Sequence, residues 1–131
     1  MITGFWTLRR AAGALGLTCA DDRLLAGIST DTRAVKPGDL FVALRGERFD
    51  AHDFLADAVR LGAGALVVSD GSRAAGAGVP VLVVDDTLVA LGALGRYHRV
   101  AWARPVIAIA GSNGKTTTKE LIRSALAPTF D

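Results

Sequence analysis

The stretch HDFLADAVRLGAGALVV, residues 52–68, contains the pattern that decides the fold class of this chain. Within it, apolar side chains recur at helical spacing: Phe54, Leu55, Ala58 and Leu61. This spacing predicts a helix over residues 52–61, and Gly62 is well placed to end it. The apolar run of residues 65–68 is short and bounded by small or polar residues, which is typical of a buried parallel strand. A helix followed directly by a buried strand predicts an α/β protein.

Helix and strand patterns alternate on both sides of this stretch. The other predicted elements are a helix over residues 7–16, strands over 24–29, 40–44 and 79–84, a helix capped by residues 85–87, a strand over 106–110 and a helix over 115–127. Residues 71–78 predict a surface loop, and Lys36-Pro37-Gly38-Asp39 predicts a turn. This order predicts an α/β fold with a small mixed or parallel sheet, flanking helices and right-handed crossovers.

Composition restricts the class of protein and its compartment. The chain has 131 residues, a net charge of +2 and a charged fraction of 21%, which favours a small globular protein over a disordered one. Its lysines and arginines are dispersed, so we expect no nucleic-acid partner. A single cysteine, Cys19, favours a reducing compartment. The apolar stretch after Arg10 is too short for a signal peptide and no run is long enough to span a membrane, so we expect a cytoplasmic protein.

A domain boundary is predicted near Trp102, within a segment of mixed charge that ends at Pro105. The predicted domains are therefore residues 1–102 and residues 103–131. The second contains one strand, one loop and one helix, which cannot cover both faces of a sheet. We expect it to be the incomplete start of a larger domain, and we expect this segment either to pack opportunistically or to pair with another copy of the chain.

A glycine-rich loop lies between the last predicted strand and the last predicted helix. Its residues are Gly111, Ser112, Asn113, Gly114, Lys115, Thr116 and Thr117. At this position backbone N–H groups and the helix N-terminus attract phosphate, Lys115 can reach the outer phosphates, and the Thr116 hydroxyl can bind Mg²⁺. The general P-loop pattern would place a further glycine at position 109, where this chain has Ile109. The alternative interpretation is a strand-to-helix turn that merely uses glycines.

The segments after the first two predicted strands also carry polar groups. Residues 29–33 supply hydroxyls, the Asp31 carboxylate and the Arg33 guanidinium, which predict either a ligand site or a hydrogen-bonded turn with a solvent-facing arginine. Residues 45–52 lie where ligands collect in α/β sheets, with an arginine at position 45 or 48 able to face a phosphate. We expect Asp50 to cap the following helix and His52 to have a capping or packing role rather than a catalytic one.

Taken together, these segments resemble the Mur ligase family, the ATP-dependent amino-acid ligases of peptidoglycan synthesis. The resemblance rests on residues 29–33, on Pro37 to Gly46, on Phe49-Asp50-x-His52-x-Phe54, and on a P-loop variant of the family's shorter kind at Gly111 to Thr116. It implies a substrate-binding domain for residues 1–102 and, for residues 103–131, the first strand, P-loop and helix of a truncated ATPase domain. Asp-Thr-Arg combined with Gly-Ser-Asn-Gly-Lys-Thr is similar to the members that add D-alanyl-D-alanine to UDP-N-acetylmuramoyl-tripeptide.

The resemblance also implies roles for individual residues. The UDP end of the substrate would be bound at these positions: Thr32, Arg33, Gly46, Glu47 and Arg48. The P-loop would bind ATP, which phosphorylates the tripeptide carboxylate before the amine of D-alanyl-D-alanine attacks. The implied catalytic residues are Lys115, which would stabilise charge on the transferred phosphoryl group, and Thr116, which would hold Mg²⁺. We expect the chain alone to bind the uridine nucleotide without catalysing the ligation.

Three alternatives stay open at this point. One is the sibling ligase that adds the third amino acid of the peptide, which more often has Gly-Thr-Asn in the loop. Another is a stand-alone nucleotide-binding module that acts as an interaction partner and performs no chemistry. A folylpolyglutamate synthetase has a related P-loop but lacks the preceding Asp-Thr-Arg and Pro-Gly-Asp-Leu-Phe motifs, which are present here.

Overall fold

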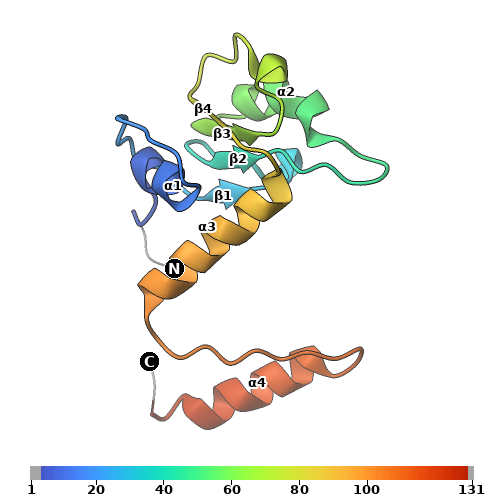
Figure 1. Ribbon diagram of the computed structural model, residues 1–131. Helices are drawn as coiled ribbons and strands as arrows, with labels where there is room; N and C mark the ends of the chain where they lie inside the picture. Colours follow the sequence, from blue (N-terminus) through green and yellow to red (C-terminus); the bar gives the residue numbers. More distant parts are fainter. Residues whose placement is uncertain (1–3, 130–131) are drawn as a thin grey trace. The chain divides into compact units, whose positions relative to one another are not determined.

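A four-stranded parallel sheet forms the centre of the first part of the chain (Figure 1). Its strands are β1 (Ile28–Ser29), β2 (Leu40–Val42), β3 (Ala65–Val68) and β4 (Val81–Val83), and each pairs in parallel with the next. The predicted α/β class is therefore confirmed, and the sheet is wholly parallel. Strand β3 has the predicted bounds, whereas β1, β2 and β4 are shorter than predicted.

The computed structural model describes residues 4–129. The chain divides into two compact units between Ala101 and Trp102. The sheet and its covering helices belong to the first unit. Among the described residues, no helix has both the length and the apolar character needed to cross a bilayer.

The described part of the first unit, from residue 4 onward, contains six helical segments beside the sheet. The α-helices are α1 (Leu8–Ala14), α2 (Leu55–Arg60) and α3 (Thr87–Trp102), and the 3-10 helices are η1 (Thr32–Ala34), η2 (Ala51–Phe54) and η3 (Gly71–Ala74). The helix predicted for residues 52–61 thus begins as η2 and continues as α2, and the predicted loop 71–78 begins with η3. The Asp86 carboxylate accepts hydrogen bonds from the backbone N–H groups of Leu88 and Val89, so the predicted cap of α3 is confirmed.

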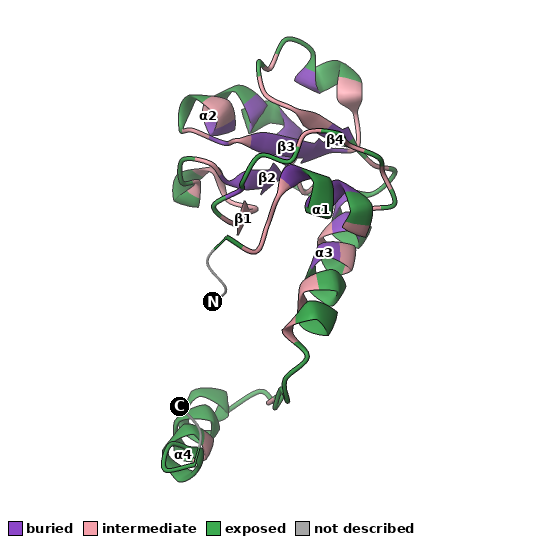
Figure 2. Ribbon diagram, turned by 90° about the vertical axis from the view of Figure 1, so that its left-hand side faces the viewer, coloured by how far each residue is buried: buried purple, intermediate pink, exposed green. Residues whose placement is uncertain are grey.

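Successive side chains along a strand point to opposite faces of the sheet. Both faces of this sheet carry buried side chains. One face packs against α1 and α3, and its strand residues include Leu40, Val42, Val67 and Leu82. The other packs against α2, η2 and η3, and its strand residues include Phe41, Leu66 and Val68. In Figure 2 the buried residues concentrate in β2 and β3. A sheet covered on both sides explains why these strands are continuous apolar runs.

The second unit contains one helix, α4 (Lys115–Leu126), close to its predicted bounds. The strand predicted for residues 106–110 is absent, because a strand forms only against a hydrogen-bonded neighbour and no described residue pairs with this segment. Val106 and Ile107 are accordingly 57% and 58% exposed. The boundary predicted near Trp102 coincides with the C-terminal end of α3, and Ala103 follows the helix with a left-handed φ of +52°.

Candidate functional site

The loops that leave β1 and β2 meet at the carboxyl edge of the sheet, where parallel α/β proteins place their ligands. A cavity of about 610 Å³ opens between them, which we call the strand-end cavity. Its lining residues come from both loops and from β2: Thr30, Asp31, Thr32, Arg33, Phe41, Phe49, Ala51 and Phe54. Hydroxyl, carboxylate, guanidinium and aromatic groups are therefore gathered around one hollow.

Asp31 and Arg33 form a local pair at the rim of this cavity. The Asp31 carboxylate accepts the backbone N–H of Arg33 at 2.9 Å and so caps η1, and it also binds the Arg33 guanidinium, with Nη2 at 2.7 Å from Oδ2. Side-chain hydrogen bonding from Arg33 lowers the pKa of Asp31 to about 2. The predicted turn role of Asp31 is confirmed. Because the Arg33 side chain is 88% exposed, its guanidinium is held in place yet stays open to a solvent-borne anion.

Residues 45–50 form a tight hairpin-like loop, the 45–50 loop, whose two ends pair as an isolated antiparallel bridge. The Gly46 N–H donates to the Phe49 carbonyl oxygen at 2.7 Å and closes the loop. Glu47 and Arg48 lie at its exposed tip. The structure thus brings Thr32 and Arg33 into the strand-end cavity but leaves Gly46, Glu47 and Arg48 outside the set that lines it.

Phe49 and Phe54 form a stacked aromatic pair beside these polar groups. Their ring centroids are 5.3 Å apart and their planes differ by 13°. Both rings line the strand-end cavity, and Phe49 and Phe54 are 54% and 36% exposed. The sequence did not predict either residue as a ligand contact, although two phenylalanines flanking a polar Asp-x-His segment were a usable signal. Exposed aromatic faces of this kind are surfaces on which nucleobases stack.

The Asp50 carboxylate is the centre of a hydrogen-bond network behind the loop. Its Oδ2 accepts from Arg45 Nη2 at 3.0 Å and from Arg73 Nη1 at 2.7 Å, while Oδ1 accepts the His52 backbone N–H at 3.0 Å. Burial would raise the pKa of Asp50, but the hydrogen bonds from His52, Arg73 and Arg45 outweigh it and hold that pKa well below its usual range. The predicted capping role of Asp50 is confirmed, and Arg45 is committed to an internal partner.

His52 is fully buried and both of its ring nitrogens are engaged. Nδ1 lies 2.7 Å from Asp50 Oδ1, and Nε2 accepts the Ser69 backbone N–H at 3.0 Å. This pairing requires the proton on Nδ1. The predicted packing role is therefore confirmed, and His52 ties the loop after β2 to the end of β3.

The glycine-rich loop of the second unit leads directly into α4. Gly114 immediately precedes the helix with a left-handed φ of +78°, and the Lys115 ammonium donates to the Gly111 carbonyl oxygen. Lys115 and Thr116 line a small cavity of about 300 Å³ together with Ile107, Ile109 and Lys119. Ser112, Asn113 and Thr117 are exposed. A loop of this backbone shape at the start of a long helix, with a lysine and a hydroxyl at its end, fits a phosphate group.

The metal prediction rests on Thr116 alone within the described part of the chain. Residues 4–129 contain no cluster of three or more histidine, cysteine, aspartate or glutamate side chains arranged to hold a metal ion. A hydroxyl directly after the loop lysine fits the Mg²⁺ that accompanies a bound nucleotide, which itself supplies oxygen ligands.

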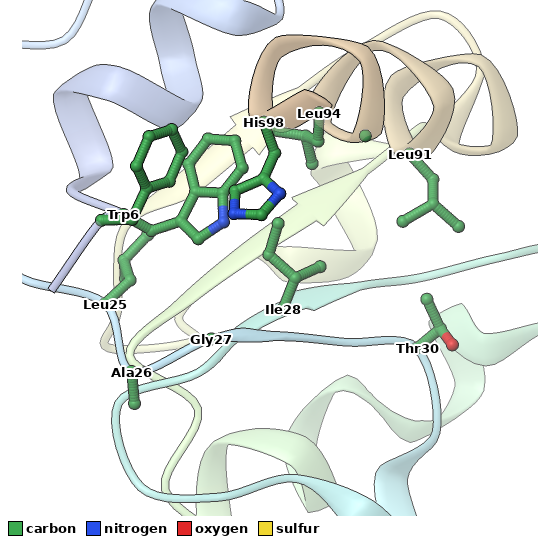
Figure 3. Close-up of a pocket in the computed structure, with 11 residues that line it drawn as sticks. Trp6, Leu25, Ala26, Gly27, Ile28, Thr30, Leu91, Leu94 and His98 are labelled. Carbon is green, nitrogen blue, oxygen red and sulfur yellow. The ribbon is translucent and has the colours of Figure 1, made fainter. Parts of the chain in front are cut away.

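A second cavity, of about 530 Å³, lies on the other face of the sheet between β1 and α3. Its lining is mostly apolar and includes Leu25, Ile28 and Leu91. Figure 3 shows the rings of Trp6 and His98 side by side, and their ring centroids are 6.1 Å apart. Among the described residues that line this cavity, the polar side chains are those of Trp6, Thr30 and His98, and none is an aspartate, glutamate, lysine or arginine.

The fold and the site define a parallel α/β protein with a polar and aromatic ligand surface at the carboxyl edge of its sheet. Comparison with known families gives this class a narrower identity. The sequence model described as "Mur ligase family, catalytic domain" matches residues 24–99, which is more than half of the chain. The chain belongs to the Mur ligase family, and the resemblance seen in its motifs is confirmed.

Curated relatives of two kinds match. The UDP-N-acetylmuramoyl-tripeptide--D-alanyl-D-alanine ligase of Escherichia coli K12 is 47% identical over 106 residues, which are 81% of this chain and 23% of that protein. The UDP-N-acetylmuramoyl-L-alanyl-D-glutamate--2,6-diaminopimelate ligase of Streptomyces coelicolor is 40% identical over 124 residues, 91% of this chain and 24% of that protein. The chain therefore spans about a quarter of the length of these relatives.

Solved structures agree with the sequence comparisons. A crystal structure of MurF from Acinetobacter baumannii superposes with a TM-score of 0.79 at 40% identity, covering 95% of this chain and 28% of that one. MurF of Thermotoga maritima in complex with ADP superposes with a TM-score of 0.64 at 32% identity, covering 78% of this chain and 23% of that one. The fold described above is thus the fold of the corresponding region in these ligases.

Proposed function

We propose that the first unit binds the uridine diphosphate end of a UDP-N-acetylmuramoyl-peptide, as the substrate-binding part of an ATP-dependent ligase of peptidoglycan synthesis. The observation that carries this proposal is the strand-end cavity, in which the stacked pair of Phe49 and Phe54 lies beside the Thr32 hydroxyl and the Arg33 guanidinium. A pyrimidine nucleotide offers a flat ring for the aromatic surface and phosphates for the cation. The relatives named for UDP-linked substrates support the same class of ligand.

Each group at the cavity has a defined part in this proposal. The exposed face of Phe49 receives the uracil ring, and the Thr32 hydroxyl offers a hydrogen bond to the sugar or a phosphate. Arg33 is oriented by Asp31 and approaches the diphosphate, where charge-assisted hydrogen bonds are strong. Gly46, Glu47 and Arg48 act from the tip of the 45–50 loop, with the Arg48 cation reaching the phosphates from the open side.

In the second unit, the glycine-rich loop is proposed to hold ATP with Mg²⁺. ATP supplies the phosphoryl group that activates a carboxylate for amide formation. Backbone N–H groups of residues 111–114 and the N-terminus of α4 bind the phosphates, together with Ser112, Asn113 and Thr117 at the edges of the loop. The Lys115 ammonium leaves the Gly111 carbonyl oxygen and neutralises charge on the outer phosphates. The Thr116 hydroxyl ligates Mg²⁺.

The parent reaction that we favour is the addition of D-alanyl-D-alanine to UDP-N-acetylmuramoyl-tripeptide. Relatives named for this reaction reach 47% identity, and MurF structures superpose on 95% of the chain. Addition of the third amino acid is the second candidate, because ligases named for 2,6-diaminopimelate match at up to 42% identity. Both candidates use the same UDP-linked end of the substrate, so the strand-end cavity serves either one.

Calorimetry on the 131-residue chain tests the proposal. UDP and ATP with Mg²⁺ are titrated separately, with CDP as the matched control for the base. We expect UDP to bind, and we expect Phe49→Ala to weaken it without changing the affinity for ATP. Binding of ATP without any binding of UDP would support the alternative of a stand-alone nucleotide-binding module and would contradict the substrate-binding role.

A further inference from the structure

Arg73 connects segments that are far apart in the sequence. It belongs to η3, which follows β3, yet its guanidinium contacts two carboxylates that follow β2. Nη1 donates to Asp50 Oδ2 at 2.7 Å, and Nη2 donates to the Asp53 carboxylate. One planar guanidinium therefore joins η3 to two carboxylates of the segment after β2, whose backbones are also linked by a hydrogen bond from the Asp53 N–H to the Asp50 carbonyl oxygen at 3.1 Å.

The two carboxylates are the sequence neighbours of the stacked aromatic pair. Asp50 directly follows Phe49, and Asp53 directly precedes Phe54. The guanidinium presents its donors in a fixed geometry, so binding both carboxylates adds to the restraint that the hydrogen bond from the Asp53 N–H to the Asp50 carbonyl oxygen already places on these two positions. The same contact therefore restricts how the rings of Phe49 and Phe54 meet at the mouth of the strand-end cavity.

The Asp50 half of this bridge is less exposed than the pair of Arg33 and Asp31, whereas the Asp53 side chain is 63% exposed. The Arg73 side chain is 29% exposed and that of Asp50 is 21% exposed, whereas the Arg33 side chain is 88% exposed. Water and salt screen a partly buried pair less than an open one. Asp50 is also fixed from behind by the buried ring of His52, so the guanidinium binds a carboxylate that is itself immobilised.

We propose that Arg73 is a positioning residue for nucleotide binding: through Asp50 and Asp53 it holds Phe49 and Phe54 stacked before the ligand arrives, so that the base meets a preformed surface. This inference rests on the proposed function, because it names the residue that organises the same cavity. Arg73 does not touch the ligand. It raises the affinity because the aromatic pair is already ordered in the free protein. Binding of the nucleotide then does not have to order the two rings.

The experiment is a double-mutant cycle on the 131-residue chain, with UDP affinity measured by calorimetry. Arg73→Ala is expected to weaken UDP binding by about three- to tenfold. In the Phe49→Ala background the same substitution is expected to have almost no further effect, because the surface it organises is already gone. Arg73→Lys restores part of the affinity, since a lysine carries one point charge and bridges less well.

Controls separate positioning from general damage to the fold. Arg23→Ala removes a matched arginine whose partner is Asp21, away from the 45–50 loop, and should leave UDP affinity unchanged. NMR contacts between the rings of Phe49 and Phe54 should persist in Arg23→Ala and weaken in Arg73→Ala without nucleotide. If Arg73→Ala does not fold, Asp53→Ala removes only the contact of Arg73 with η2 and is expected to weaken UDP binding in the same direction.

The outcomes are distinguishable. Unchanged UDP affinity in Arg73→Ala, or an equal loss in the Phe49→Ala background, would overturn the positioning role while leaving the proposed function intact. Failure of the unsubstituted chain to bind UDP would overturn the proposed function and this inference with it. Weaker binding together with loss of the effect in the Phe49→Ala background supports the inference.

Discussion

The Nδ1 atom of His52 lies 2.7 Å from Oδ1 of Asp50, and the imidazole ring of His52 is fully buried. On its other side the ring accepts the Ser69 backbone N–H at 3.0 Å. A buried histidine with both nitrogens engaged acts as a structural link, here between the loop after β2 and the end of β3. The polar loops at the strand-end cavity therefore rest on a fixed base.

We expect His52→Ala to lower the free energy of unfolding by about 2–3 kcal/mol, because it opens a cavity and leaves the backbone N–H of the half-buried Ser69 without its acceptor. Urea unfolding of the 131-residue chain measures the loss. His52→Gln retains an acceptor near Ser69 and should be less damaging than His52→Ala. Equal stability of the unsubstituted chain and His52→Ala would contradict the structural role.

The Asp50 carboxylate gives stability a dependence on pH. Its pKa is held below the usual range in the folded protein, whereas in the unfolded chain it returns to about 4. The ionised carboxylate therefore stabilises the fold above that pH, and the contribution is lost as the pH falls below about 4 and the unfolded state takes up a proton. We expect Asp50→Asn to have a lower free energy of unfolding than the unsubstituted chain at neutral pH. The gap between the two free energies should become smaller as the pH falls. Chemical unfolding at several pH values between 7 and about 3 measures this gap, and parallel curves would contradict the prediction.

The sequence predicted the central strands well because their signal is local. Residues 65–68 are apolar at every position, which burial on both faces demands, and the structure forms β3 with these bounds. Residues 106–110 carry a similar signal but form no strand, because pairing depends on a neighbour that the pattern cannot supply. Local patterns thus predict which segments are able to form strands, and only tertiary pairing decides which of them do.

The candidate site divides in the same way. The capping roles of Asp31 and Asp50 were predictable, since each accepts a backbone N–H two residues along the chain. The contact between Arg73 and Asp50 was not, because it spans 23 residues and depends on how η3 leaves the sheet. The stacking of Phe49 on Phe54 likewise depends on the turn that brings their segments together. Contacts made across the sheet edge required the folded structure.

Phe49→Ala is expected to weaken UDP binding about tenfold, within the range that a single base-stacking contact contributes. The ring is 54% exposed, so its removal should change the free energy of unfolding little. Leu24→Ala is a matched control, because Leu24 is 70% exposed and lies outside the cavity lining. Calorimetry measures the affinities, and an unchanged affinity for UDP in Phe49→Ala would exclude this ring as the base-binding surface.

Lys115→Ala is expected to reduce ATP affinity by at least about tenfold while leaving UDP affinity unchanged, because the ammonium belongs to the glycine-rich loop of the second unit. Arg123→Ala is the matched control, since Arg123 is a cation on the same helix and lies outside the lining of the small cavity around Lys115 and Thr116. We also expect the 131-residue chain to form no amide bond, as it corresponds to about a quarter of its relatives. Measurable ligation by the purified chain would contradict this expectation.

Gly62 and Gly13 provide a paired test of the fold that supports the site. Gly62 has a left-handed φ of +104°, and a Cβ there would lie 3.0 Å from Cα of Pro37, so Gly62→Ala should destabilise the protein by about 1–3 kcal/mol. Gly13 lies on the exposed side of α1 with nothing within 4 Å of a Cβ, so Gly13→Ala should stabilise it by about 0.5–1 kcal/mol. Thermal unfolding measures both changes. An unchanged or raised stability of Gly62→Ala would show that the close approach of the turn at Pro37 to the end of α2 does not constrain position 62.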